Sequence, residues 1–188
     1  MLCEPVSNTG QLPVLATSNL GQGQLMLRHV AADDDIPFII DLLKRETAQN
    51  WDAGVLLDSM QESFNYIAHS QASQAFIVRL DGVPLFEIEI HEARKHVDLH
   101  SGYRASAGDY FIILLAGGVD QSPMHAYSQG LRLCLDYFFS FPEVRSIIVP
   151  LYAGLDAVKR TELYSMTGIE KFLDRSQPKE PDLYRIGR

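Results

Sequence analysis

The sequence predicts an α/β protein in which helices flank a central mixed β-sheet of about seven strands. Three observations support this fold class. Segments with strand and helix patterns alternate along most of the 188 residues. Asp81-Gly82 separates two strand-like segments, as in a tight hairpin. The segment 109–116 is apolar nearly throughout, which is typical of a central strand covered on both faces.

Residues 1–22 predict an irregular N-terminal arm, because they are rich in Gly, Ser, Asn, Gln and Pro. They lack the cationic segment followed by an apolar segment that marks a secretory signal. Residues 23–188 are predicted to form a single domain, which is long enough to bury a sizeable core. Its first strand is predicted at Leu25–Val30.

Two helices are predicted next. Acidic residues offer N-caps to the first helix, and Pro37 suits its first turn. Apolar residues at helical spacing give each helix one buried face. The N-cap candidates are Asp33, Asp34 and Asp35, and the apolar face consists of Ile36, Ile39, Ile40 and Leu43. The second helix covers Leu56–His69, with an apolar side made of Met60, Phe64, Tyr66 and Ile67.

The second half of the sequence predicts a hairpin followed by alternating strands and helices. A helix between two strands is the usual connection of parallel neighbours, so the strands over 109–116 and 144–150 are predicted to be parallel. The elements, in order, are strands over 74–80 and 83–91, a polar connection over 92–108, a strand over 109–116, a helix over about 123–139, a strand over 144–150, a helix ending near Tyr164, and strands near 169–173 and 182–186.

Composition narrows the range of partners. The net charge of −8 argues against nucleic acid as the main partner, since phosphate binding needs a basic surface. No apolar segment approaches the roughly 20 residues of a membrane-spanning helix, so no membrane partner is expected. Cys3 and Cys134 are not expected to form a disulfide, and this usage fits a cytoplasmic protein.

Polar residues alternate along the second hairpin strand. Glu87, Glu89 and His91 share one face, and apolar residues occupy the other. In a sheet covered on both sides, such a polar face indicates a cleft in which Glu89 or His91 acts as a base, directly or through a water. The alternative is a half-exposed strand with a solvated acidic face.

The helix over 123–139 offers an anion-binding N-terminus. Its free amides and its dipole would favour a pyrophosphate, to which His125 and Gln129 could add donors. The alternative is a well-capped helix with Ser122 as N-cap and Pro123 in its first position.

Two further patterns have simpler interpretations. His96, Asp98 and His100 have a spacing that could bind a metal on a strand, but a polar connection is favoured, so no metal is expected. Aromatic residues close the long helix and fill either the core or a subunit interface, which leaves a homodimer possible. They are Tyr137, Phe138, Phe139 and Phe141.

The order of elements, together with Tyr164 four residues before Gly168 at a helix end, resembles the GNAT acyltransferase superfamily. Helices often end in Gly for steric reasons alone, so this pair is informative only with the element order. Residues 81–93, followed by a polar linker and Gly108-Asp109, resemble the branch that acylates amines or hydroxylamines in siderophore assembly, such as aerobactin-type and mycobactin-type enzymes. The resemblance covers about residues 24–187.

This resemblance implies an N-acyltransferase, most simply an acetyltransferase, with acyl-coenzyme A as co-substrate and a small amine or hydroxylamine as acceptor. It also implies that the strands over 109–116 and 144–150 splay apart. Tyr164 would face the sulfur and serve as general acid, the alternative being a core tyrosine. The implied cofactor-binding residues are Leu115, Gly117, Gly118, Met124, His125, Ala126, Tyr127 and Gln129.

Three positions depart from the pattern of that branch. The catalytic histidine aligns with Ile113, and the catalytic aspartate aligns with Gly154, two residues before Asp156. The basic pyrophosphate loop aligns with Met124–Tyr127. The sequence therefore leaves two hypotheses: an acyltransferase that uses other residues, or a catalytically silent binding module of the same fold.

Overall fold

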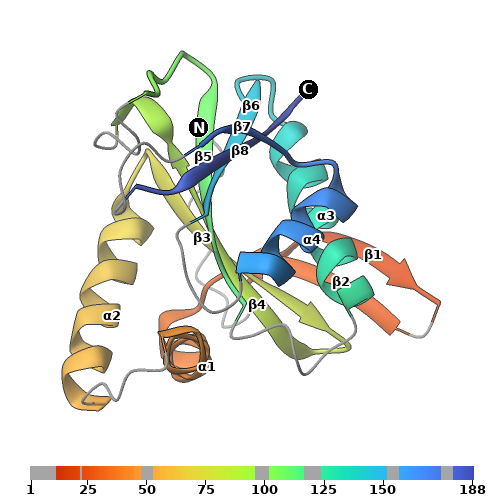
Figure 1. Ribbon diagram of the computed structural model, residues 1–188. Helices are drawn as coiled ribbons and strands as arrows, with labels where there is room; N and C mark the ends of the chain where they lie inside the picture. Colours follow the sequence, from red (N-terminus) through yellow and green to blue (C-terminus); the bar gives the residue numbers. More distant parts are fainter. Residues whose placement is uncertain are drawn as a thin grey trace.

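Figure 1 shows the fold in a computed structural model, which describes residues 12–21, 23–47, 53–95, 102–116, 124–151, 157–174 and 180–188. The described residues form one eight-stranded mixed sheet, so the predicted α/β class is confirmed. The elements are β1 Val14–Leu20, β2 Gly23–His29, α1 Ala32–Thr47, α2 Ala53–His69, β3 Ser73–Leu80, β4 Val83–Glu92, a 3-10 turn over Ala93–Lys95, β5 Asp109–Leu115, α3 Met124–Phe139, β6 Ser146–Leu151, α4 Ala157–Thr167, β7 Glu170–Leu173 and β8 Asp182–Gly187.

The strands lie in the order β1-β2-β3-β4-β5-β6-β8-β7. Neighbouring strands are antiparallel except for β5 and β6, which are parallel as predicted. These two strands pair only where residues 109–111 lie opposite residues 146–148, although both continue further. Residues 112–115 of β5 and 149–151 of β6 no longer pair with each other, and we call these two strand ends the β5–β6 fork. The predicted splaying is therefore present.

The N-terminal arm prediction is wrong for residues 14–20. These residues form β1, an edge strand that pairs with β2 through an irregular register near Val14. The segment has a weak hydrophobic pattern, with Thr, Ser and Asn among its apolar residues. Its strand conformation therefore depends on hydrogen bonding to β2, which local composition does not predict.

Helices cover both faces of the sheet, with α1 and α2 on one face and α3 and α4 on the other (Figure 1). The larger core lies under α3 and α4, where Phe76, Phe86, Ile112 and Phe138 are fully buried. A second apolar cluster joins α1 and α2 to β3 and β5 through residues such as Ile36, Phe64, Ile77 and Leu115. A third lies around Phe111 and Tyr103.

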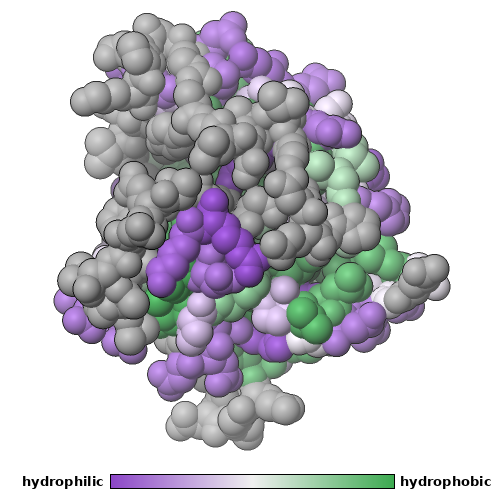
Figure 2. All heavy atoms as spheres, turned by 60° about the horizontal axis from the view of Figure 1, so that its bottom comes forward, coloured by the Kyte–Doolittle hydropathy of each residue, from purple (hydrophilic) through white to green (hydrophobic). Residues whose placement is uncertain are grey.

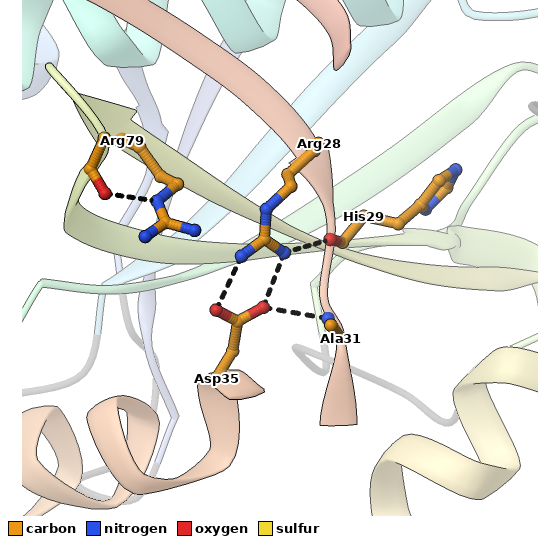
Figure 3. Close-up of polar contacts among 6 residues, drawn as sticks. Arg28, His29, Ala31, Asp35 and Arg79 are labelled. Carbon is orange, nitrogen blue, oxygen red and sulfur yellow. Dashed lines mark hydrogen bonds and ion pairs between the residues drawn. The ribbon is translucent and has the colours of Figure 1, made fainter. Parts of the chain in front are cut away.

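A buried ion pair fixes the start of α1 to β2 (Figure 3). Arg28 donates two hydrogen bonds to Asp35, at 2.6 and 2.8 Å, and Asp35 also accepts one from the backbone amide of Ala31 at 2.8 Å. The helix begins at Ala32, so the three predicted N-cap candidates, Asp33, Asp34 and Asp35, all lie inside its first turn, and none of them is the N-cap. The paired geometry satisfies a carboxylate that burial would otherwise penalise.

Among the described residues, Gly82, Gly108, Gly168 and the non-glycine Asp81 have a positive φ. Asp81 and Gly82 have φ values of 49° and 80°, which fits the predicted tight turn between β3 and β4. Gly168, with φ of 80°, ends α4. The amide of Ile169 there donates to the carbonyl of Tyr164 at 2.9 Å, as in a glycine C-cap. The spacing of Tyr164 and Gly168 therefore has a structural basis of its own.

Side-chain exposure corrects one prediction and decides between two interpretations. Tyr66 is 68% exposed and does not belong to the buried side of α2, whereas Phe64 and Ile67 do. The aromatic residues at the end of α3 pack on the main core, with Phe138 fully buried. The core interpretation of that cluster is therefore supported.

The face of the molecule shown in Figure 2 is chemically mixed. On the face in Figure 2, hydrophobic residues reach the surface beside strongly hydrophilic ones. Among the described helices, none is long and apolar enough to cross a membrane.

Candidate active site

The candidate site is a polar strip on β4 that lies between two apolar clusters. Glu87, Glu89 and His91 alternate with Phe86, Ile88 and Ile90, which are fully buried on the opposite face of the sheet. On the adjacent strand β5, Leu115 belongs to the cluster beneath α1 and α2, and Phe111 belongs to the third cluster. The polar residues therefore lie where the apolar covering of this face is interrupted.

Glu89 and His91 form a hydrogen-bonded pair. His91 Nε2 lies 2.7 Å from Glu89 Oε2, and His91 Nδ1 lies 2.8 Å from Ser73 Oγ. A carboxylate only accepts, so Nε2 carries the proton, and Ser73 donates to Nδ1 when the imidazole is neutral. The ring also stacks on Phe111, with centroids 4.6 Å apart. His91 is thus fixed by contacts on two edges and one face.

Ser73 is a site residue that the sequence did not single out. It lies directly opposite His91 in the pairing of β3 with β4, and its side chain is buried. The cross-strand position places the hydroxyl beside the imidazole. Only the exact register of the β3–β4 hairpin could have indicated that Ser73 lies opposite His91. The Asp81-Gly82 turn does not determine that register, because a bulge near Val78 shifts it.

Ile113, for which the predicted resemblance implied a histidine position, is 45% exposed. Such exposure is unusual for the middle of a central strand. Ile113 lies directly opposite Glu89 in the β4–β5 pairing, so the two side chains share one face. Glu89 is partly exposed, with a side-chain value of 19%. An accessible apolar surface therefore adjoins an accessible carboxylate.

Tyr164 lies on the other side of the sheet. It is 1% exposed, belongs to the core beneath α3 and α4, and meets the Tyr184 ring edge-on with centroids 5.4 Å apart. One helical turn earlier on α4, Arg160 donates to the carbonyl of Leu114 in the β5–β6 fork at 2.8 Å. Residues four apart share a helix face, so Tyr164 lies along the same side of α4 as Arg160.

The predicted phosphate-binding residues occupy the first turns of α3. His125 is exposed, Met124 and Gln129 are partly buried, and the side chains of Ala126 and Tyr127 lie in the core. Tyr127 stacks on Phe86. Buried side chains there leave the backbone amides, His125 and Gln129 as donors for an anion. Gly117, Gly118, Ser122, Gly154 and Asp156 lie outside the described residues, as do His96, Asp98 and His100.

Asp109, part of the Gly-Asp motif, joins the start of β5 to its surroundings. It accepts hydrogen bonds from Tyr103 Oη at 2.7 Å, Ser106 N at 2.8 Å and Ser146 Oγ at 2.8 Å. Burial alone would raise the pKa of Asp109, but these donors and nearby Arg185 hold it below the usual value. Burial, reinforced by Asp109, raises the pKa of Tyr103. This network stabilises the paired base of the fork.

Within the described residues, no group of three His, Cys, Asp or Glu side chains could hold a metal ion. The pair formed by Glu89 and His91 joins a carboxylate oxygen to an imidazole nitrogen at 2.7 Å. A carboxylate hydrogen-bonded to an imidazole can accept one proton and share it within the pair.

Comparison with solved structures shows close similarity of fold at low sequence identity. An uncharacterized protein from Bacillus halodurans is 16% identical, with a TM-score of 0.72 over 93% of this chain and 92% of that one. Aminoglycoside acetyltransferase AAC(6')-Ib in complex with coenzyme A is 18% identical, with a TM-score of 0.70 over 87% and 95%. A spermidine N-acetyltransferase SpeG chimera from Vibrio cholerae and hSSAT is 20% identical, with a TM-score of 0.58 over 86% and 92%.

No curated protein sequence matches this chain. The acetyltransferase (GNAT) domain family, in contrast, matches residues 32–162, more than half of the sequence. That match spans β4, β5 and the first half of α4, and so includes the polar strip and the fork but ends before Tyr164. The enzyme class that the sequence predicted, an N-acetyltransferase, is the class of this family and of its structural neighbours. The chain therefore belongs to the acetyltransferase (GNAT) domain family.

Proposed function

We propose that this protein transfers the acyl group of an acyl-coenzyme A, most simply acetyl-coenzyme A, to a small molecule that carries an aliphatic amine or hydroxylamine. The observation that carries the proposal is the pair of Glu89 and His91 beside the exposed Ile113. A base in reach of solvent and an apolar surface next to it suit an amine borne on an aliphatic chain.

The donor would bind along the β5–β6 fork. Beyond Phe111 and Ile148, β5 does not pair with β6 among the described residues, so its backbone can hydrogen-bond an extended chain that bears amides. The fork also adjoins both sides of the sheet, with the Glu89 pair on one and Tyr164 on the other. The coenzyme A bound to the aminoglycoside enzyme of similar fold supports this class of donor.

The roles of the residues follow from their positions. Glu89 takes the proton of the attacking amine, and His91 stabilises the protonated pair through its Nε2 hydrogen bond. Ser73 keeps the imidazole in the orientation that this hydrogen bond requires. Tyr164 donates its phenol proton to the departing thiolate, for which a neutral hydroxyl suffices. When bound, the donor supplies the activated thioester.

The finer acceptor class comes from the resemblance of residues 81–93 to siderophore-assembly enzymes, which suggests hydroxylamines or amines of lysine and ornithine derivatives. The aminoglycoside and spermidine acetyltransferases of similar fold broaden the set to polyamines and amino sugars. A panel with acetyl-coenzyme A should therefore include N6-hydroxylysine, ornithine derivatives, spermidine and an aminoglycoside. Release of free thiol and the mass of the product identify the acceptor.

Glu89→Gln is the decisive variant, because glutamine keeps the shape of the side chain and cannot take a proton. We expect turnover to fall by about 10²- to 10⁴-fold. Glu92→Gln is the matched control, since Glu92 lies at the end of the same strand and pairs with the exposed Lys95. If the parent binds no coenzyme A and acylates no acceptor, the silent-module hypothesis replaces this proposal, with Ile113, Gly154 and Met124–Tyr127 as its explanation.

A further inference from the structure

The inner edge of β5 in the fork carries backbone groups that point away from β4. In an antiparallel pair, the amide and carbonyl of one residue face the same side. Leu114 lies opposite Ile88 in the β4–β5 pairing, yet its carbonyl accepts a hydrogen bond from α4. That carbonyl therefore faces the side on which β6 would continue if the two strands had stayed paired.

At Leu114, where β5 no longer pairs with β6, Arg160 provides a hydrogen-bond donor in place of the β6 backbone. Its guanidinium donates to the Leu114 carbonyl at 2.8 Å, and Leu114 is buried. A buried carbonyl needs a hydrogen-bond partner, and a charged donor is a strong one. The side chain of Arg160 is itself partly buried, although its charge would favour full exposure. The contact is thus a specific feature of the fork rather than a surface encounter.

We propose that the Arg160 guanidinium and the amide-bearing arm of the acyl-coenzyme A compete for the same hydrogen-bonding position on β5, the carbonyl of Leu114. Donor binding then requires the guanidinium to leave the Leu114 carbonyl. This inference rests on the proposed function, because it assumes that the donor lies along the fork. It makes Arg160 a residue that sets donor affinity.

The proposal has a direct energetic consequence. Removing the guanidinium removes a competitor for Leu114, and it also leaves that carbonyl without this donor in the free protein. Both effects favour the complex of the protein with coenzyme A over the free protein. Hydrogen bonds to charged groups contribute enough to change an equilibrium constant by about tenfold or more. Arg160→Met, which keeps the length of the side chain and removes its donors, should therefore bind coenzyme A about tenfold more tightly.

Arg132 offers a matched control. It also donates to a backbone carbonyl of α4, that of Met166 at 2.6 Å, but it lies on α3 and is exposed. Arg132→Met removes one arginine–carbonyl contact and one positive charge, as Arg160→Met does. Titration calorimetry with coenzyme A and with acetyl-coenzyme A should give the parent affinity for Arg132→Met and the higher affinity for Arg160→Met.

The outcomes separate the two proposals. If the parent binds coenzyme A and Arg160→Met binds equally or more weakly, the inference about Arg160 is overturned and the proposed function stands. If neither the parent nor any variant binds, both fall. Should Arg160→Met fail to fold, nitrogen-15 NMR of the parent gives the answer. The Arg160 guanidinium protons must exchange faster with solvent after coenzyme A is added, while those of Arg132 stay unchanged. Unchanged Arg160 exchange overturns the inference.

Discussion

At the scale of single residues, Glu89 and Ile113 occupy neighbouring positions on adjacent strands. They are cross-strand partners, so their Cβ atoms lie about 5 Å apart. A base on either strand would therefore reach nearly the same point above the sheet. If Ile113 stands where the siderophore branch carries its histidine, as the resemblance implies, the acid–base pair that we propose for Glu89 and His91 lies only one strand away.

Tyr164→Phe tests the proposed general acid. The substitution keeps the ring and its packing on Tyr184 and removes only the hydroxyl. We expect kcat to fall by about 10²- to 10⁴-fold, while the affinity for acyl-coenzyme A stays nearly unchanged. Tyr184→Phe removes a neighbouring hydroxyl, which lies 3.4 Å from Thr161 Oγ1, and should leave kcat close to that of the parent. Parent-like turnover in Tyr164→Phe would exclude the tyrosine from the mechanism.

Asp109 should make stability depend on acidic pH. Its pKa is lowered in the folded protein, so the ionised form favours folding. This contribution is fully present above the ordinary value of 3.8 and is lost as the pH falls through the lower folded value. Asp109→Asn should lower the melting temperature at pH 7 and show a smaller further drop than the parent between pH 5 and pH 2. Parallel melting curves across that range would contradict this assignment.

At the scale of elements, local patterns predicted most of the strands and helices but not their edges. The alternation of polar and apolar residues along β4 predicted the polar strip, and the continuous apolar segment of β5 predicted a central strand. The strand β1 was not predicted, because its pairing with β2 is a contact between segments. The same reason applies to the site: Ser73 and Arg160 act through partners on other elements, which one-dimensional periodicity does not reveal.

Gly130→Ala tests how closely α3 packs on the sheet. In a helix interior, alanine is favoured over glycine by about 1 kcal/mol. A Cβ at position 130, however, would lie 2.8 Å from the ring of Phe86, which is fully buried and stacks on Tyr127. We expect the overpacking to outweigh the propensity, at about 1–3 kcal/mol of lost stability in urea denaturation. Asp136→Ala, at an exposed position of α3, is the control and should not destabilise the protein. A stabilised Gly130→Ala would refute the close approach.

At the scale of the whole molecule, the sheet consists of two parts that meet at the base of the fork. One part runs from β1 to β5, and the other contains β6, β8 and β7. Three residue pairs join them in the sheet, and the Asp109 hydrogen bond to Ser146 reinforces that junction. The catalytic groups proposed above are divided between the two parts, with Glu89 in the first and Tyr164 on α4 beside the second. A donor bound along the fork would therefore link both parts.

This arrangement predicts how the donor affects stability and exchange. A ligand that binds only the folded state at about 100 times its Kd adds about 2.7 kcal/mol of stability, which raises the melting temperature of a protein of this size by roughly 5–10 °C. The added protection from exchange should concentrate on the backbone amides of residues 112–115, because these residues form the β5 side of the fork. Hydrogen exchange with and without coenzyme A measures it, with β2 as an internal control because two strands, β3 and β4, separate it from β5. Protection that spreads evenly over the sheet, or that is confined to its β1 edge, would mean that the donor does not bind along the fork. The assignment of Glu89 as the base and Tyr164 as the acid of one reaction would then lose its basis.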